Sequence, residues 1–164
     1  MKFHSPMIIV SDIEKSKRFY VDILHEEIEQ DLGTYVVFGG GFSMMTREQW
    51  NELTGETSNT KEKTGHSFEL YFEEDQLNNF AQQLEGHADI IKFTELQEAP
   101  WGQRTIRFLD PDHHVVEVSE SMSSVVKRFL SSGMTVQETC EKSMMSVTFV
   151  EKCRINMAQP SEKG

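Results

Sequence analysis

The sequence predicts an α+β fold made of two similar modules and a helical extension. Three observations predict it. Short apolar runs indicate strands and one amphipathic pattern indicates a helix, and they first occur in the order strand, helix, strand, strand, strand. The same order then returns after roughly 64 residues, which indicates an internal repeat. Beyond residue 120 the strand patterns stop and three short helical patterns follow.

The first module is predicted within residues 3–46. Residues 6–10 form an apolar run of strand type, and Ser11 with Glu14 has the spacing of a capping box at the start of a helix. Apolar positions recur at helical spacing up to residue 24, with Ser16 and Tyr20 on the same face. Residues 28–45 then supply three short strands, separated at 31–33 and at 39–41.

The second module is predicted within residues 66–120. Residues 66–73 read as a strand, and Asp75 is the expected cap of the helix that follows. Strands are expected at about 90–96, 103–109 and 114–119 from their apolar runs and turn residues. The polar stretch between the modules, 46–65, is expected to be a linker over a cleft, with a short helix around 49–53.

Three features occur together: the two modules, the opening IIVSDIEKSKRFYVDIL and the closing PWGQRTIRFLDPDHHVVEV. In this combination the sequence resembles the vicinal oxygen chelate superfamily of glyoxalases, bleomycin-resistance proteins and dioxygenases. The resemblance covers residues 3–120 and implies that the strands form a cupped mixed sheet with a ligand cleft. It also implies a cleft that holds a small molecule and often a divalent metal. A lyase, isomerase or dioxygenase-like activity is the corresponding expectation for an enzyme.

The metal site that the resemblance implies is incomplete in this sequence. The four positions that carry ligands in metal-using relatives correspond here to Ser5, Met45 (or Met44), Glu69 and Glu117. Only the two glutamates are usual ligands for a divalent ion, and a catalytic centre normally has three protein ligands. His4 neighbours Ser5, but strand alternation turns it to the opposite face unless a bulge intervenes. Any metal is therefore expected on Glu69 and Glu117.

The last hairpin predicts which side chains share a face. If 111–113 is a three-residue loop closed by His113 in a left-handed conformation, Asp110 pairs with His114 and Arg107 stands opposite Glu117. The cleft-facing side chains predicted from this register and from strand alternation are Ser5, Met7, Ile9, Glu69, Tyr71, Glu73, Gln103, Thr105, Arg107 and Glu117, with Trp101 at the rim. His114 is a further candidate ligand.

Three interpretations of these residues remain open. Arg107 and Glu117 could simply satisfy one another as a cross-strand ion pair. The cleft could bind a small cationic or aromatic molecule on Trp101 and Tyr71, with Arg107, Gln103, Ser5 and Met7 around it. Alternatively, Glu117 or Glu69 could be the catalytic base that removes a proton from an activated carbon acid.

The extension, 121–164, differs from the domain at 1–120 in charge. Residues 1–120 carry 10 basic and 23 acidic side chains, whereas 121–164 carry 6 and 4. Its apolar stripes predict three helices, with a capping box at Thr135 and Glu138. They favour an arm that docks on its own body or forms a homodimer. The alternative is a ligand-sensing transcription regulator that uses these helices as a helix-turn-helix.

The overall charge limits the partners. A net charge of -11 disfavours nucleic acid and anionic membranes. No apolar run is long enough for a membrane span, and the two cysteines, Cys140 and Cys153, are expected to be reduced thiols. The chain is therefore expected to be a cytoplasmic protein with a small-molecule ligand.

Overall fold

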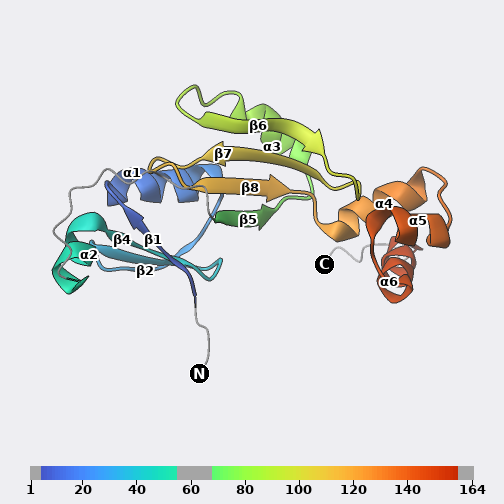
Figure 1. The fold of residues 1–164 in the computed structure, drawn as a ribbon, viewed down its shortest axis with the longest axis horizontal. Helices are drawn as coiled ribbons and strands as arrows, with labels where there is room; N and C mark the ends of the chain where they lie inside the picture. Colours follow the sequence, from blue (N-terminus) through green and yellow to red (C-terminus); the bar gives the residue numbers. More distant parts are fainter. Residues whose placement is uncertain (1–4, 55–67, 159–164) are drawn as a thin grey trace. The chain divides into compact units, whose positions relative to one another are not determined.

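The computed structural model describes residues 5–54 and 68–158, and its elements follow the predicted order (Figure 1). The first module contains β1 (Met7–Val10), α1 (Ile13–Arg18), the π-helical turn η1 (Phe19–Ile23), β2 (Ile28–Asp31), β3 (Tyr35–Phe38), β4 (Ser43–Thr46) and α2 (Arg47–Thr54). The second contains β5 (Glu69–Glu73), α3 (Leu77–Leu84), β6 (Ile91–Glu98), β7 (Arg104–Leu109) and β8 (Val115–Ser119). The extension contains α4 (Met122–Ser131), α5 (Val136–Ser143) and α6 (Val147–Ala158). The predicted α+β class is confirmed.

The two modules repeat one sheet topology. The strand order is β1-β4-β3-β2 in the first sheet and β5-β8-β7-β6 in the second. In each module the first and last strands are parallel neighbours, β1 with β4 and β5 with β8. By their contacts the residues divide into two units, 1–68 with 109–114, and 69–108 with 115–164. Each unit is described by itself.

The core of the first unit lies between its sheet and the helix that follows β1. Ile8 and Val10 alternate with more exposed neighbours along β1, and both are buried, as the apolar run predicts. Tyr20, on η1, is fully buried. Its ring centroid lies 5.5 Å from the ring centroid of Phe38 and 5.1 Å from that of Phe42. This aromatic cluster attaches the helix to one face of the sheet.

Both predicted helix caps on the two modules are wrong. Asp12, and not Ser11, caps α1, because its side chain accepts a 2.9 Å hydrogen bond from Lys15 N. Asp75 does not cap α3; it accepts hydrogen bonds from the Ser121 and Ser124 hydroxyls at 2.7 and 2.6 Å. Local spacing could not reveal the partners of Asp75, because Ser121 and Ser124 lie 46 and 49 residues further along the chain.

The turn between β7 and β8 has the predicted conformation. Asp110 N donates to His114 O at 3.0 Å, His113 N donates to Asp110 O at 2.9 Å, and His113 has φ 68°. A hydrogen bond from Glu120 N to Arg104 O continues the same register to the far end of the hairpin. The three-residue loop is therefore confirmed.

Asp110 is the structural centre of this turn. Its carboxylate is buried and accepts four hydrogen bonds, from Asp112 N at 2.9 Å and from His114 N, the His114 ring and the Tyr20 hydroxyl at 2.8 Å each. Burial and the negative charge of Asp110 raise the pKa of Tyr20 well above its usual value, so the phenol remains a donor. Asp112 adds bonds from Ser11 N and the Ser16 hydroxyl. His114, a candidate ligand, is thus engaged by Asp110.

We expect the His114–Asp110 pair to make stability depend on pH. Burial alone would lower the pKa of His114, but the hydrogen bond and charge of Asp110 outweigh it and raise the pKa above 6.5. A raised pKa in the folded state contributes stability below pH 6.5, and this contribution disappears as pH rises through the folded-state pKa. Urea unfolding between pH 5 and 9 should show this loss in the wild type and in the control His87→Gln, but not in His114→Gln. An identical pH profile in His114→Gln would contradict it.

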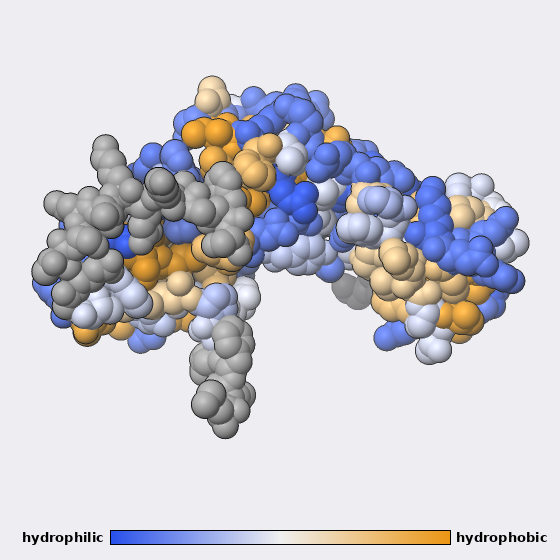
Figure 2. Space-filling view, viewed as in Figure 1, coloured by the Kyte–Doolittle hydropathy of each residue, from blue (hydrophilic) through white to orange (hydrophobic). Residues whose placement is uncertain are grey.

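The helical extension forms a small core of its own and also packs on the second module. Val126, Val150 and Cys153 are buried together between α4, α5 and α6. The predicted capping box is present, with Glu138 N donating to the Thr135 hydroxyl at 3.2 Å and Thr135 N donating to the Glu138 carboxylate at 2.8 Å. Apolar side chains also remain exposed on the surface of this arm (Figure 2).

Within the two described stretches of the chain, no helix has both the length and the apolar character that a membrane crossing requires. Most of the predicted linker and the first two residues of the predicted strand 66–73 lie outside the described residues.

Candidate functional site

The candidate site lies on one face of the β5-β8-β7-β6 sheet. The parallel register places Tyr71 beside Glu117 and Glu73 beside Ser119. Leu70 is buried on the opposite face, whereas Glu69, Tyr71 and Glu73 are exposed, as strand alternation predicts. The hairpin register adds Arg107 to the face that carries Glu117.

Arg107 binds both candidate carboxylates at once. Its Nε donates to Glu69 Oε2 at 3.0 Å, and its Nη2 donates to Glu117 Oε2. Glu117 is only 5% exposed, and its second oxygen accepts a 2.6 Å hydrogen bond from the Ser119 hydroxyl. The cross-strand ion pair between Arg107 and Glu117 is therefore present, and Glu69 extends it into a clamp of two carboxylates around one guanidinium. We call this the Arg107 clamp.

A pocket of about 290 Å³ opens beside this clamp. Its lining residues are Gln97, Glu98, Ala99, Pro100, Trp101, Gln103, Thr105, Arg107 and Glu117. Sequence reasoning named five of these, including Trp101 at the rim. The volume suits a small ligand, at the lower end of the range for binding pockets.

Gln103 holds the aromatic side chains of the site in position. The side chain is buried, and its Oε1 accepts a 3.0 Å hydrogen bond from Trp101 Nε1. Its Nε2 donates to the Tyr71 hydroxyl at 3.0 Å and to Glu120 O at 2.8 Å. Trp101, a residue that is 39% exposed, is therefore presented at the pocket with its indole N–H already bonded.

Tyr71 is a neutral phenol in this network. Its hydroxyl donates to Glu73 Oε1 at 3.1 Å. Burial raises the pKa of Tyr71, and the charges of Glu73 and Glu117 add to this, although the hydrogen bond from Gln103 opposes it. Tyr71 offers an aromatic surface and a hydrogen-bonding hydroxyl, and it does not supply a phenolate at neutral pH.

Negative charge exceeds positive charge around the site. Three arginines are bound to the carboxylates of this region: Arg107 in the clamp, and Arg104 and Arg128 on Glu120. Burial alone would raise the pKa of Glu120, but the hydrogen bonds from Arg104 and Arg128 outweigh it and lower that pKa. The carboxylates in contact with this network are Glu69, Glu73, Glu98, Glu117 and Glu120. A cationic ligand is therefore electrostatically favoured.

The remaining predicted site residues belong to the first unit. Met7 is paired with Ser43, and Ile9 with Met45, across the parallel β1 and β4 strands. Met45 is half-buried and Met44 fully buried, so Met45 is the member of the pair on the less buried face. Ser5 precedes β1 and is half-buried. His4 lies outside the described residues.

The described residues do not fit the divalent metal centre that the resemblance implies. Among residues 5–54 and 68–158 no three His, Cys, Asp or Glu side chains are grouped so that they could hold an ion. Glu69 and Glu117 are already ion-paired with the Arg107 guanidinium, so a carboxylate oxygen of each is engaged. Serine and methionine are poor ligands for such ions.

Sequence reasoning missed several residues of the site, among them Ser119, Glu98 and Arg128. Ser119 could have been found, because it lies two residues from Glu117 on the same face of β8. Glu98 and its partner Arg128 could not, because their contact joins the end of β6 to a helix 30 residues later.

Comparisons with known proteins agree with this fold. A protein of unknown function from Agrobacterium tumefaciens str. C58 is 36% identical, with a TM-score of 0.67, over 74% of this chain and 94% of that one. A glyoxalase/bleomycin resistance protein/dioxygenase family enzyme from Burkholderia phytofirmans PsJN is 17% identical, with a TM-score of 0.61, over 73% and 98%. The fosfomycin resistance protein FosX from Mesorhizobium loti is 17% identical, with a TM-score of 0.51, over 73% and 92%. The last two show the fold alone.

None of the curated proteins compared with the chain matches it. A family model described as a glyoxalase-like domain matches residues 3–123, which is most of the chain and ends at the start of α4. The chain therefore belongs to the glyoxalase-like domain family, within the vicinal oxygen chelate superfamily.

Proposed function

We propose that the chain binds a small aromatic cation in the 290 Å³ pocket beside Trp101, and that it does so without a metal ion. The observation that carries the proposal is the presentation of Trp101, whose ring is held by Gln103 at a pocket with excess negative charge. An indole ring attracts a cation through its face and stacks on flat apolar groups. Arg107 and Glu117 of the Arg107 clamp belong to the same lining.

Binding is better supported than proton abstraction by Glu117. A catalytic base needs a free oxygen within reach of the substrate proton. One oxygen of Glu117 accepts from Arg107 and the other from Ser119, and Glu69 is also bound to Arg107. A base at either position has to give up these contacts first, so we propose no lyase, isomerase or dioxygenase step for this site.

The test is a thermal-shift comparison of three probes: 2-phenylethylammonium, 2-cyclohexylethylammonium and benzoate, at equal ionic strength. At ten times its Kd, the aromatic cation should raise the Tm of the wild type by about 3 to 6 °C. The shift should be smaller for the cyclohexyl cation and absent for benzoate. Trp101→Ala should lose it, whereas the control Trp50→Phe should keep it. An equal shift in Trp101→Ala, or a larger shift with benzoate, would contradict the proposal.

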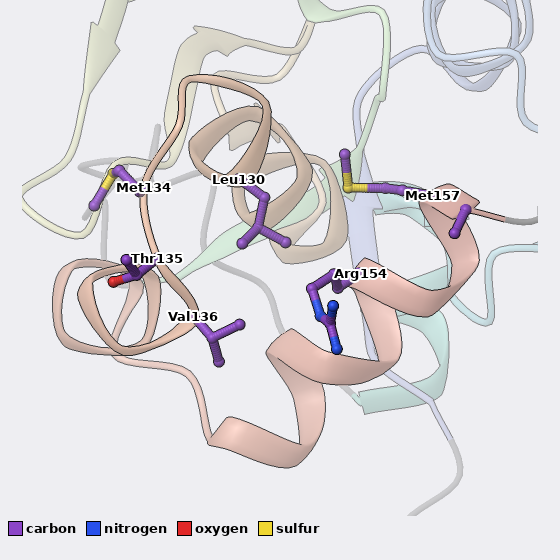
Figure 3. Close-up of a pocket in the computed structure, with 7 residues that line it drawn as sticks. Leu130, Met134, Thr135, Val136, Arg154 and Met157 are labelled. Atoms are coloured by element: carbon purple, nitrogen blue, oxygen red, sulfur yellow. The ribbon is translucent and has the colours of Figure 1, made fainter.

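Homodimer formation and a cytoplasmic location stay proposals alongside it. The arm supports the first, because Met144, Val147 and Ile155 are exposed on it and it also carries a groove of about 460 Å³. Figure 3 shows this groove between the ends of α4 and α6 and the start of α5, with Leu130, Met134, Val136 and Met157 around it. Two free cysteines, Cys140 and Cys153, agree with a reducing compartment.

The alternative of a transcription regulator gains no support from the part of the arm that the structure describes. Of the two basic side chains that α6 could offer to DNA, Arg154 is bound to Glu151 at 2.7 Å. DNA-reading helices usually present a dense basic face.

A further inference from the structure

The rim of the pocket is a tight turn between β6 and β7. Ala99 N donates to Gln103 O and Gly102 N donates to Ala99 O, each at 2.8 Å, and Gly102 has φ +86°. This turn carries both Trp101 and Gln103, so its position decides where the aromatic surface of the pocket lies.

The same turn is packed against α4 of the helical arm. A Cβ on Gly102 would lie 2.0 Å from Cζ of Phe129, so the Phe129 ring rests directly on the glycine backbone. Only glycine allows this approach together with a positive φ. Phe129 is buried, with the Lys142 ammonium of α5 lying 4.5 Å from its ring centre. Two helices of the arm therefore contribute to the contact.

Arg128 binds three parts of the rim with one guanidinium. Its Nη2 donates to Gly102 O and, at 3.0 Å, to Glu120 Oε2, while its Nη1 donates to Glu98 Oε2 at 3.4 Å. These acceptors lie at the end of β6, in the turn and directly after β8. Glu98 itself lines the pocket. A planar guanidinium can bridge several acceptors in this way, whereas an ammonium acts as a point charge.

We infer that the helical arm sets the shape of the pocket rim, with Arg128 as the positioning residue and Phe129 as the packing contact. The arm lies almost wholly outside the residues matched by the family model, which end at 123, so this support is added to the family domain. Because coupling between two sites is reciprocal, a molecule that displaces the 99–103 turn also loosens the docking of α4.

The test needs no ligand and is therefore independent of the proposed function. In a Trp50→Phe background, Trp101 is the only tryptophan of the chain. Acrylamide quenching then reports the exposure of Trp101, and hydrogen exchange of the Ala99 and Gly102 amides reports the turn. Arg128→Gln should raise quenching about twofold and speed exchange of Gly102 about tenfold or more, because charge-assisted hydrogen bonds are lost.

The matched control is Arg154→Gln, which removes the same charge from the same arm, at a residue bound to Glu151. It should leave both readouts at the wild-type level. Arg128→Lys keeps the charge and should give intermediate values, and it serves as the test if Arg128→Gln does not fold. Should neither Arg128 variant differ from Arg154→Gln while folded, the inference is overturned.

Discussion

Replacing Arg107 by methionine is expected to lower the free energy of unfolding by about 3 kcal/mol and to create a weak site for divalent cations. Truncating one partner leaves a charge buried without compensation, which costs about 3 to 5 kcal/mol in fully buried pairs. Glu117 is that charge here, and the partial exposure of Arg107 reduces the loss. Urea unfolding measures it.

A weak divalent-cation site is the second expected consequence of Arg107→Met. Without the guanidinium, Glu69 and the Oε2 atom of Glu117 lose their cationic partner and can share a hard cation. Millimolar Mn²⁺ should therefore raise the Tm of Arg107→Met but not that of the wild type. Arg107→Lys, which keeps a cation, and Arg104→Met, which removes one of the two arginines from Glu120 and leaves Arg128 bound to it, are the controls, and neither should respond. Stabilisation of the wild type by Mn²⁺, lost in Glu69→Gln, would show instead that a metal displaces Arg107.

Replacing Asp110 by alanine is expected to cost about 3 to 4 kcal/mol, because several buried donors lose their acceptor together. Two backbone amides, the Tyr20 hydroxyl and the His114 ring all donate to this one carboxylate or pair with it. An unsatisfied buried donor costs about 1 to 3 kcal/mol, and rearrangement recovers part of the sum.

Asp112→Ala is the matched control for this prediction. It removes a carboxylate from the same turn, but one whose two contacts, to Ser11 N and the Ser16 hydroxyl, are more exposed. We expect a loss of about 1 kcal/mol. Equal losses in the two variants, measured by urea unfolding at pH 6, would mean that the Asp110 network adds nothing beyond a surface turn.

Sequence reasoning predicted those parts of the site that depend on local geometry. The length of the 111–113 loop determines the hairpin register, and the register places Arg107 opposite Glu117. Alternation along β5 then predicts that Glu69 and Tyr71 share a face. The same local rules gave both modules and the capping box of α5.

Contacts between segments distant in the chain could not be predicted in this way. The bond from Arg107 to Glu69 depends on which strands become neighbours in the sheet, and the bond from Gln103 to Tyr71 depends on side-chain rotamers. Asp75 shows the same limit, because its spacing suits a helix cap while its partners are serines on another helix. Local spacing identifies the hydrogen bonds that a side chain could form, and tertiary contacts determine which of them it does form.

The bonds between Tyr20, Ser11 and the 110–114 turn also bear on the order in which the chain can fold during synthesis. The partners lie 90 and 101 residues apart, so the helix of the first unit emerges from the ribosome long before its acceptors. Domains generally fold as units once their segments are available. The N-terminal unit thus lacks part of its hydrogen-bonded core until residue 114 has been made, and its completion is tied to translation of most of the second module.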